Sequence, residues 1–171
     1  MNVPLPETAV RPGVPLAAHE FDEFEAGLLP VLRHFMLSYQ EPAGQAWQQA
    51  YIVAAERWGE ASWGEAIGLP AALALMKVVR AALNSRSGQF GFIDPFDLDH
   101  RGKVTPDEAA LLRMLHHMRR DQTGQARAAV AEVAGGKMEP QVIQAGLAFA
   151  HRFSAGPAAD CAQSPRLRVV A

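Results

Sequence analysis

Residues 69–84 read LPAALALMKVVRAALN, and this stretch decides the fold. Lys77 and Arg80 are the only charged residues between Pro70 and Leu83, so a helix built from it is apolar on almost every side. Such a helix is usually buried by neighbours on several sides. Pro70 suits the first turn, where a missing N–H costs little. We therefore expect residues 69–84 to form the central helix of a bundle.

Five further segments carry apolar residues at the three- and four-residue spacing of an amphipathic helix. No stretch shows the sustained two-residue alternation that is typical of a half-buried strand. The prediction is an all-α, single-domain fold, an irregular bundle of about six helices. The five segments are residues 20–39, 42–58, 105–121, 125–134 and 140–153.

Pro30 lies inside the first of these segments and removes one backbone donor from its helix. On a helical wheel it falls opposite the apolar stripe, so a bend at this position would leave the core face intact. The alternative is a break into two shorter helices.

Both ends of the chain differ in composition from the helical segments. Residues 1–18 contain four prolines and predict an extended arm rather than a regular element. Residues 155–171 return to proline, glycine and small side chains and predict a mobile tail. The helical domain is expected at residues 19–154.

The net charge, the lengths of the apolar runs and the cysteine count exclude several classes of protein. The formal net charge is −2, which gives no overall attraction to nucleic acid or to an anionic membrane. No run of about 18 apolar residues could span a bilayer, and the first 16 residues lack the basic and apolar regions of a signal peptide. Cys161 is the single cysteine, so no intrachain disulfide or cysteine-based metal cluster can form. The expected location is the cytoplasm.

Residues 94–108 read DPFDLDHRGKVTPDE, and they hold the one spacing of oxygen-bearing residues that indicates a ligand. Aligned on Gly102, the stretch from residue 97 resembles the EF-hand calcium loop. That loop has carboxylates at its first, third and twelfth positions and supplies a backbone carbonyl at its seventh. The resemblance implies a calcium ion as cofactor, held by Asp97, Asp99, the Lys103 carbonyl, Thr105 and Glu108.

Part of the same pattern has a structural explanation. Thr105 followed three residues later by Glu108 is a capping box, with Pro106 at the first helical position. Arg101 also stands at the fifth position, where the EF-hand family places an oxygen ligand. Residues 88–95 contain two glycines and a proline, so a regular entering helix is not expected. The calcium site and the purely structural loop both remain open.

Four basic residues share one face of the segment 105–121: Arg113, His116, His117 and Arg120. They predict either a patch for phosphate, nucleic acid or an acidic partner, or a solvated face whose cations suit a helix C-terminus. No aromatic platform or glycine-rich loop accompanies them, so we do not expect nucleic acid as the partner.

Catalytic motifs do not emerge from the sequence. There is no Gly-x-Ser-x-Gly, no phosphate loop, no dinucleotide fingerprint and no Glu-x-x-His for a di-iron site. His34 and His151 fall on the polar sides of their helices and are expected to be exposed. No catalytic residue is therefore named, and we lean away from an enzyme.

Three functional hypotheses follow. The first is a binding or scaffold protein that acts through a surface toward a protein partner or itself, as a homodimer. The second is a helical module stabilised by calcium or magnesium at residues 97–108. The third is an enzyme with a site dispersed over the bundle, which a pocket with converging His, Asp or Glu side chains would favour over the first.

Overall fold

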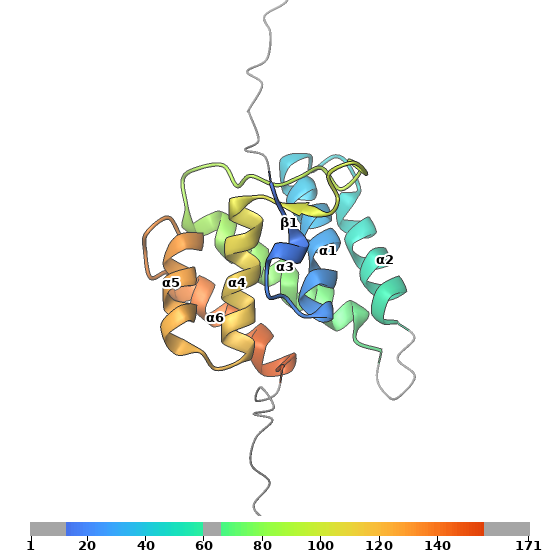
Figure 1. The fold of residues 1–171 in the computed structure, drawn as a ribbon. Helices are drawn as coiled ribbons and strands as arrows, with labels where there is room; N and C mark the ends of the chain where they lie inside the picture. The colour runs from blue at the N-terminus through green and yellow to red at the C-terminus, as the bar shows by residue number, and fades with distance from the viewer. Residues whose placement is uncertain (1–12, 60–65, 156–171) are drawn as a thin grey trace, which may run out of the picture.

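Six α-helices make up most of the structure, a computed structural model that describes residues 13–59 and 66–155 (Figure 1). This confirms the all-α prediction, and the observed bounds lie within a few residues of the expected ones. None of the helices in the described ranges is both long and apolar enough to cross a membrane. The helices are α1 (Glu23–Gln40), α2 (Ala46–Trp58), α3 (Gly68–Ser85), α4 (Pro106–Arg119), α5 (Thr123–Val133) and α6 (Pro140–Arg152).

Two helices begin at reciprocal capping boxes that the sequence encodes. Asp22 accepts a hydrogen bond from the Glu25 amide at 2.8 Å, and the Glu25 carboxylate accepts one from the Asp22 amide at 3.0 Å. Thr105 and Glu108 form the same pair at the start of α4. Each box satisfies two amides that a helix N-terminus leaves without partners. Pro30 lies inside α1 without breaking it, which decides between the two alternatives for this segment.

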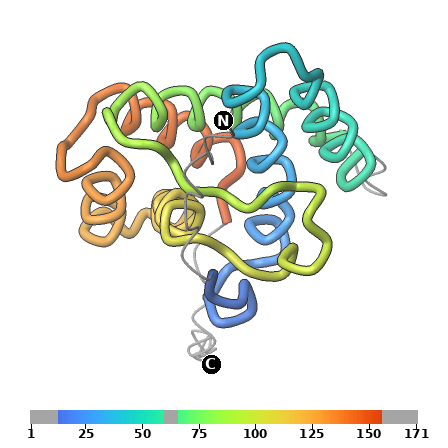
Figure 2. The backbone as a smooth tube through the Cα atoms, turned by 90° about the horizontal axis from the view of Figure 1, so that it is seen from above, coloured from blue at the N-terminus to red at the C-terminus, as the bar shows by residue number. Residues whose placement is uncertain are grey.

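The helices pack mainly in three pairs: α1 against α2, α4 against α5, and α3 against α6 (Figures 1 and 2). Additional contacts join α2 to α3 and α4 to α6, so the three pairs enclose one continuous core. Large side chains from four helices are fully buried in that core, namely Leu28, Leu32 and Phe35 of α1, Leu75 of α3, Leu111 and Leu115 of α4 and Phe149 of α6.

The helix α3 has several neighbours, as its apolar composition predicts, but it is not enclosed. It contacts α1, α2 and α6. One stripe remains open to solvent, where Leu69 is 56 % and Leu73 is 44 % exposed and Lys77 and Arg80 follow on the same side. The more enclosed helix is α1, in which residues 27–29 and 31–36 are all buried.

The described part of the predicted N-terminal arm is attached to the bundle. Val14–Pro15 forms strand β1, which pairs antiparallel with β2 (Lys103–Val104), and a short 3₁₀ turn follows at Leu16–Ala18. The Leu16 amide donates to the Gly102 carbonyl at 2.8 Å. A proline fits here because β1 is an edge strand and needs few donors. The remainder of the arm, residues 1–12, and residues 156–171 of the predicted tail lie outside the described residues.

We expect Gly68→Ala to lower the free energy of unfolding by about 1–3 kcal/mol, because a Cβ at Gly68 would stand 2.5 Å from the Ala54 carbonyl oxygen, where α3 crosses α2. The matched control is Gly124→Ala in α5, where no neighbouring heavy atom lies within 4 Å of the added carbon. Alanine has the higher helix propensity, so this control should be neutral or slightly stabilising. Urea denaturation of both variants checks the pair, and equal effects would contradict the close α2–α3 packing.

Candidate functional site

The segment between α3 and α4 is irregular, as its glycines and proline predict. No helix enters the loop, because α3 ends at Ser85 and residues 86–102 form neither helix nor strand. The segment instead crosses the C-terminal part of α1 and then meets β1 (Figure 1).

Glu108 is the most constrained residue of this region. Its carboxylate is fully buried and receives a two-point contact from Arg33 of α1, with Nε 2.8 Å from Oε1 and Nη2 3.1 Å from Oε2. Backbone amides complete the set: Thr105 donates to Oε2 at 2.9 Å and Ile93 to Oε1 at 3.2 Å. Pairing and hydrogen bonds of this kind offset the cost of burying a carboxylate.

The Arg33 guanidinium also holds the backbone of the loop. It donates to the Arg101 carbonyl at 3.1 Å and makes a short hydrogen bond to the Lys103 carbonyl. In the EF-hand alignment, Lys103 supplies the seventh-position carbonyl and Glu108 the twelfth-position carboxylate. A side chain from α1 therefore occupies these acceptors, which the resemblance assigns to a calcium ion.

Of the other predicted ligands, Asp97 and Asp99 lie apart from this group, whereas Thr105 is bonded to Glu108. The Asp97 carboxylate accepts from the amides of Asp99 and His100 and contacts His100 Nδ1 at 2.8 Å, while the Asp99 side chain is exposed. Thr105 Oγ1 caps α4 and donates to the Gly91 carbonyl at 2.6 Å.

The structure thus brings Lys103, Thr105 and Glu108 together around Arg33 and leaves Asp97 and Asp99 outside that group. Within residues 13–59 and 66–155, no group of three or more His, Cys, Asp or Glu side chains is arranged to hold a metal ion. The calcium site stays a prediction. Binding by both oxygens of Glu108 would require Arg33 to move.

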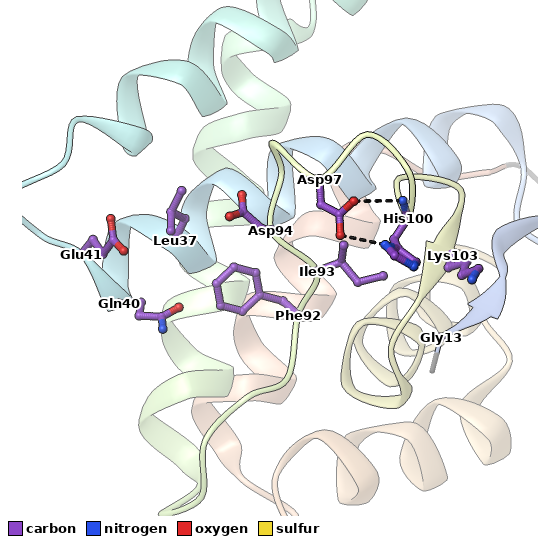
Figure 3. Close-up of a pocket in the computed structure, with 10 residues that line it drawn as sticks. All are labelled: Gly13, Leu37, Gln40, Glu41, Phe92, Ile93, Asp94, Asp97, His100 and Lys103. Atoms are coloured by element: carbon purple, nitrogen blue, oxygen red, sulfur yellow. Dashed lines mark hydrogen bonds and ion pairs between the residues drawn. The ribbon is translucent and has the colours of Figure 1, made fainter. Parts of the chain in front are cut away.

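A pocket of about 580 Å³ opens between the C-terminal end of α1 and residues 92–103 (Figure 3). We call it the acidic pocket. Apolar side chains form part of its wall, and polar side chains from α1 and the loop face the same space (Figure 3). Its lining comprises Gly13, Leu37, Gln40, Glu41, Phe92, Ile93, Asp94, Asp97, His100 and Lys103.

Among the described residues that line the acidic pocket, negative charge predominates, with three carboxylates and one lysine. A hydrogen bond from His100 lowers the pKa of Asp97, and backbone amides lower it further, so Asp97 is ionised at neutral pH. One Asp94 oxygen accepts from the Phe96 amide at 2.9 Å. In the described part of the chain, no ion pair joins Glu41 or Asp94 to a cation. The pocket is therefore suited to a positively charged group.

His34 was expected on the polar side of its helix, and this prediction is wrong. The side chain is 7 % exposed and lies edge-on to the Phe96 ring, with 5.6 Å between ring centroids. Within the described residues its Nδ1 has no hydrogen-bond partner. Burial lowers the pKa of His34, and the nearby charge of Asp94 opposes that shift only in part.

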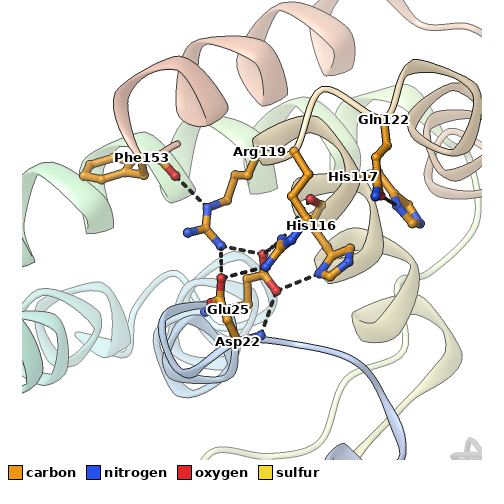
Figure 4. Close-up of polar contacts among 8 residues, drawn as sticks. Asp22, Glu25, His116, His117, Arg119, Gln122 and Phe153 are labelled. Carbon is orange, nitrogen blue, oxygen red and sulfur yellow. Dashed lines mark hydrogen bonds and ion pairs between the residues drawn. The ribbon is translucent and has the colours of Figure 1, made fainter. Parts of the chain in front are cut away.

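The basic face predicted on α4 is largely occupied by an acid from α1 (Figure 4). Glu25 is fully buried, and its carboxylate accepts short hydrogen bonds from Arg119 and Arg120 and contacts His116 Nδ1 at 2.9 Å. Asp22 contacts the same two arginines, each at 2.9 Å. We call these five residues the Glu25 cluster.

The remaining two basic residues of that face also have partners. Arg113 pairs with Glu132 at 2.8 Å, and His117 lies 2.6 Å from the Gln122 side-chain oxygen (Figure 4). The expectation of a solvated face is therefore wrong for His116 and Arg120. His116 and Arg120 are also not free to bind an anion, because both contact Glu25. Glu25 lies 91 residues before His116 and 95 before Arg120.

Ionisation of the Glu25 cluster stabilises the fold. Burial alone raises the pKa of Glu25, but hydrogen bonds from Arg120, His116 and the Asp22 amide outweigh burial and hold that pKa below its usual range. The pKa of Asp22 is also lowered, by the Glu25 amide and by Arg119 and Arg120 against the effect of burial. Both carboxylates therefore remain charged at neutral pH.

The sequence contains a signal for these buried charges that the pattern analysis missed. Glu25 stands three residues before Leu28 and seven before Leu32, so it falls on the apolar stripe of its helix. Glu108 stands four residues before Leu112, and Arg119 stands four residues after Leu115, so both fall on the apolar stripe of their helix. A charged residue on an apolar stripe needs a buried partner, although the stripe does not say which residue that is.

No protein-family model, curated protein or solved structure matches this chain. Its function is therefore inferred from the charges, distances and burial of its own residues.

We expect Arg33→Met to lower the free energy of unfolding by about 3–5 kcal/mol, because it leaves the buried Glu108 carboxylate without its charge partner. The matched control is Arg113→Met, which removes an exposed pair with Glu132 and should cost about 1 kcal/mol or less. Urea denaturation at pH 7 measures both. In the double variant Arg33→Met/Glu108→Gln, the loss should be partly recovered. A cost below about 1 kcal/mol for Arg33→Met would contradict the structural role of this pair.

Stability should decline as the pH falls, in two ranges. The folded-state pKa of His34 is lowered, so the unfolded chain binds its proton first and stability decreases as the pH falls below about 6.5. The lowered pKa values of Glu25 and Asp22 act in the same direction below about pH 4.5.

Melting temperatures between pH 8 and pH 5 check the first range. His34→Leu should reduce the slope, whereas the control Phe96→Leu, which keeps the imidazole, should preserve it. An unchanged slope in His34→Leu would contradict this assignment.

Proposed function

We propose that this protein binds a small, positively charged organic molecule in the acidic pocket. The observation that carries the proposal is that Glu41, Asp94 and Asp97 line one cavity together with apolar side chains. A volume of about 580 Å³ is in the range of small-molecule sites, which combine apolar walls with a few polar groups that fix orientation.

The distribution of charge supports an amine or guanidine as the binding group. Glu41 and Gln40 lie at one end of the acidic pocket, Asp94 lies between, and Lys103 lies at the other end (Figure 3). A cation is attracted to the Glu41–Asp94 end and repelled from Lys103. The ligand's apolar portion would then contact Leu37 and Phe92, which face the same space.

The floor of the pocket is held in place before any ligand arrives. The Ile93 amide is bonded to Glu108, and the Lys103 carbonyl is bonded to Arg33, so both ends of the segment 93–103 are anchored to a buried ion pair. A site whose backbone is already ordered loses less conformational entropy on binding. This anchoring supports specific recognition rather than loose electrostatic attraction.

A second candidate function is catalysis, and it rests on Asp97 and His100. A carboxylate that holds one imidazole nitrogen fixes the ring and leaves the other nitrogen for proton transfer. His100 Nδ1 lies 2.8 Å from Asp97, and both residues line the acidic pocket. In this alternative the free nitrogen of His100 would act as a general base and take a proton from a neutral O–H or C–H group of the bound molecule.

The test is a pair of ligands that share a four-carbon chain and differ in their end groups, ammonium in one and neutral hydroxyl in the other. We expect 1,4-diaminobutane to raise the melting temperature and to bind measurably by calorimetry, and 1,4-butanediol to do neither. Asp94→Asn and Glu41→Gln should each weaken diamine binding about tenfold, the loss of roughly one charged contact.

The control for general electrostatic attraction is Glu56→Gln, which removes an exposed carboxylate from α2. This variant should bind like the unaltered protein. Equal binding of diamine by Asp94→Asn and Glu56→Gln would overturn the proposal.

The same melting-temperature assay, with calcium added in place of the diamine, tests the calcium hypothesis. Calcium at millimolar concentration raises the melting temperature if residues 97–108 hold the ion, and Asp97→Ala then abolishes the rise. No rise at that concentration would end this hypothesis without affecting the diamine result.

A further inference from the structure

We propose that the groove between α3 and α6 binds an acidic, amphipathic helix of a partner protein. The two helices run alongside each other (Figure 2), and a groove of about 580 Å³ lies along them. We call it the α3–α6 groove. It shares no lining residue with the acidic pocket, so the inference is independent of the proposed function.

The positive charge of the α3–α6 groove indicates an acidic partner. Lys77 and Arg80 of α3 and Arg152 of α6 line the α3–α6 groove, and the described residues that line it include no Asp or Glu. This positive groove lies on a chain whose net charge is −2. In the part of the chain that the structure describes, none of these three cations is in an ion pair. Their charge is available to carboxylates of a partner.

The small side chains that line the groove indicate that the bound segment is a helix. Besides the cations, the groove is lined by small side chains, among them Ala74, Ala145 and Ala148, and by Leu73, which is 44 % exposed. The amides Asn84, Gln141 and Gln144 also line it. Small residues let a third helix approach to the interaxial distance of packed helices, about 8–10 Å. A groove that combines alanines and a leucine with cations complements a helix with leucines on one face and glutamates beside them.

The same lining argues against nucleic acid. Single strands bind on exposed aromatic platforms, on which their bases stack. Of the described residues that line the groove, Phe149 alone is aromatic, and it is fully buried. The exposed leucine and the alanines offer nothing to a phosphate, whereas they fit an apolar helix face.

The experiment uses fluorescence polarisation with a labelled synthetic 14-residue helix that carries leucines at helical spacing and glutamates on both sides of them. Two matched peptides serve as controls, one with every glutamate replaced by glutamine and one with the same composition in scrambled order. We expect the full chain to bind the acidic helix at least tenfold more tightly than either control.

Protein variants then locate the contact. Lys77→Glu/Arg80→Glu should weaken binding at least tenfold, and Leu73→Asp should weaken it without changing the charge of the cations. The control Arg127→Glu/Lys137→Glu makes the same charge change at exposed positions outside the groove and should retain binding. Amide chemical shifts should change on α3 and α6 only.

Three results would overturn the inference. The first is equal binding of the amphipathic and scrambled acidic peptides, or binding that survives Lys77→Glu/Arg80→Glu. The second is a single-stranded oligonucleotide that binds as tightly as the helix and loses affinity in the same variant. The third is a concentration-dependent dimer, seen by sedimentation, that the same variant abolishes and that excludes the peptide, because the groove would then bind a second copy of this chain.

Discussion

The structure depends on two buried charge contacts of opposite polarity between α1 and α4. Near its start α1 presents an acid, Glu25, to Arg119 at the end of α4, and further along it presents Arg33 to Glu108 at the start of α4. Both contacts form together only when the two helices run in opposite directions. A parallel arrangement or a shifted register would leave buried charges without partners, which costs several kcal/mol for each contact. The pairs thus define the direction and register of α1 against α4.

The Arg33–Glu108 contact links this packing to the candidate site. Through Arg33 it holds the carbonyls of Arg101 and Lys103, and through Glu108 it holds the Ile93 amide. The loop that lines the acidic pocket is therefore fastened to the core at both ends, although its own composition of turn residues would allow many conformations. The strand β1 adds a further attachment on the side of Lys103.

Opposite charges are concentrated on two separate parts of the surface. The acidic pocket contains carboxylates from the residue after α1 and from the loop before α4. The α3–α6 groove contains three cations from two helices that are distant in sequence. A net charge of −2 describes neither region, because the total averages over them. Net charge bears on overall attraction to polyanions, whereas recognition depends on the local arrangement of charged side chains.

The sequence by itself determined the fold class, the approximate helix bounds and the capping box at Thr105, since apolar periodicity and capping act over only a few residues. Tertiary structure alone decided that α1 continues through Pro30, that His34 is buried, and that His116 and Arg120 serve Glu25 rather than solvent. It also placed Arg33 on acceptors 68–75 residues away in the calcium-like loop. Residue spacing identifies oxygen atoms that could bind a cation. Only the packed helices show that the Arg33 side chain contacts those oxygens, because this contact depends on distances between segments remote in sequence.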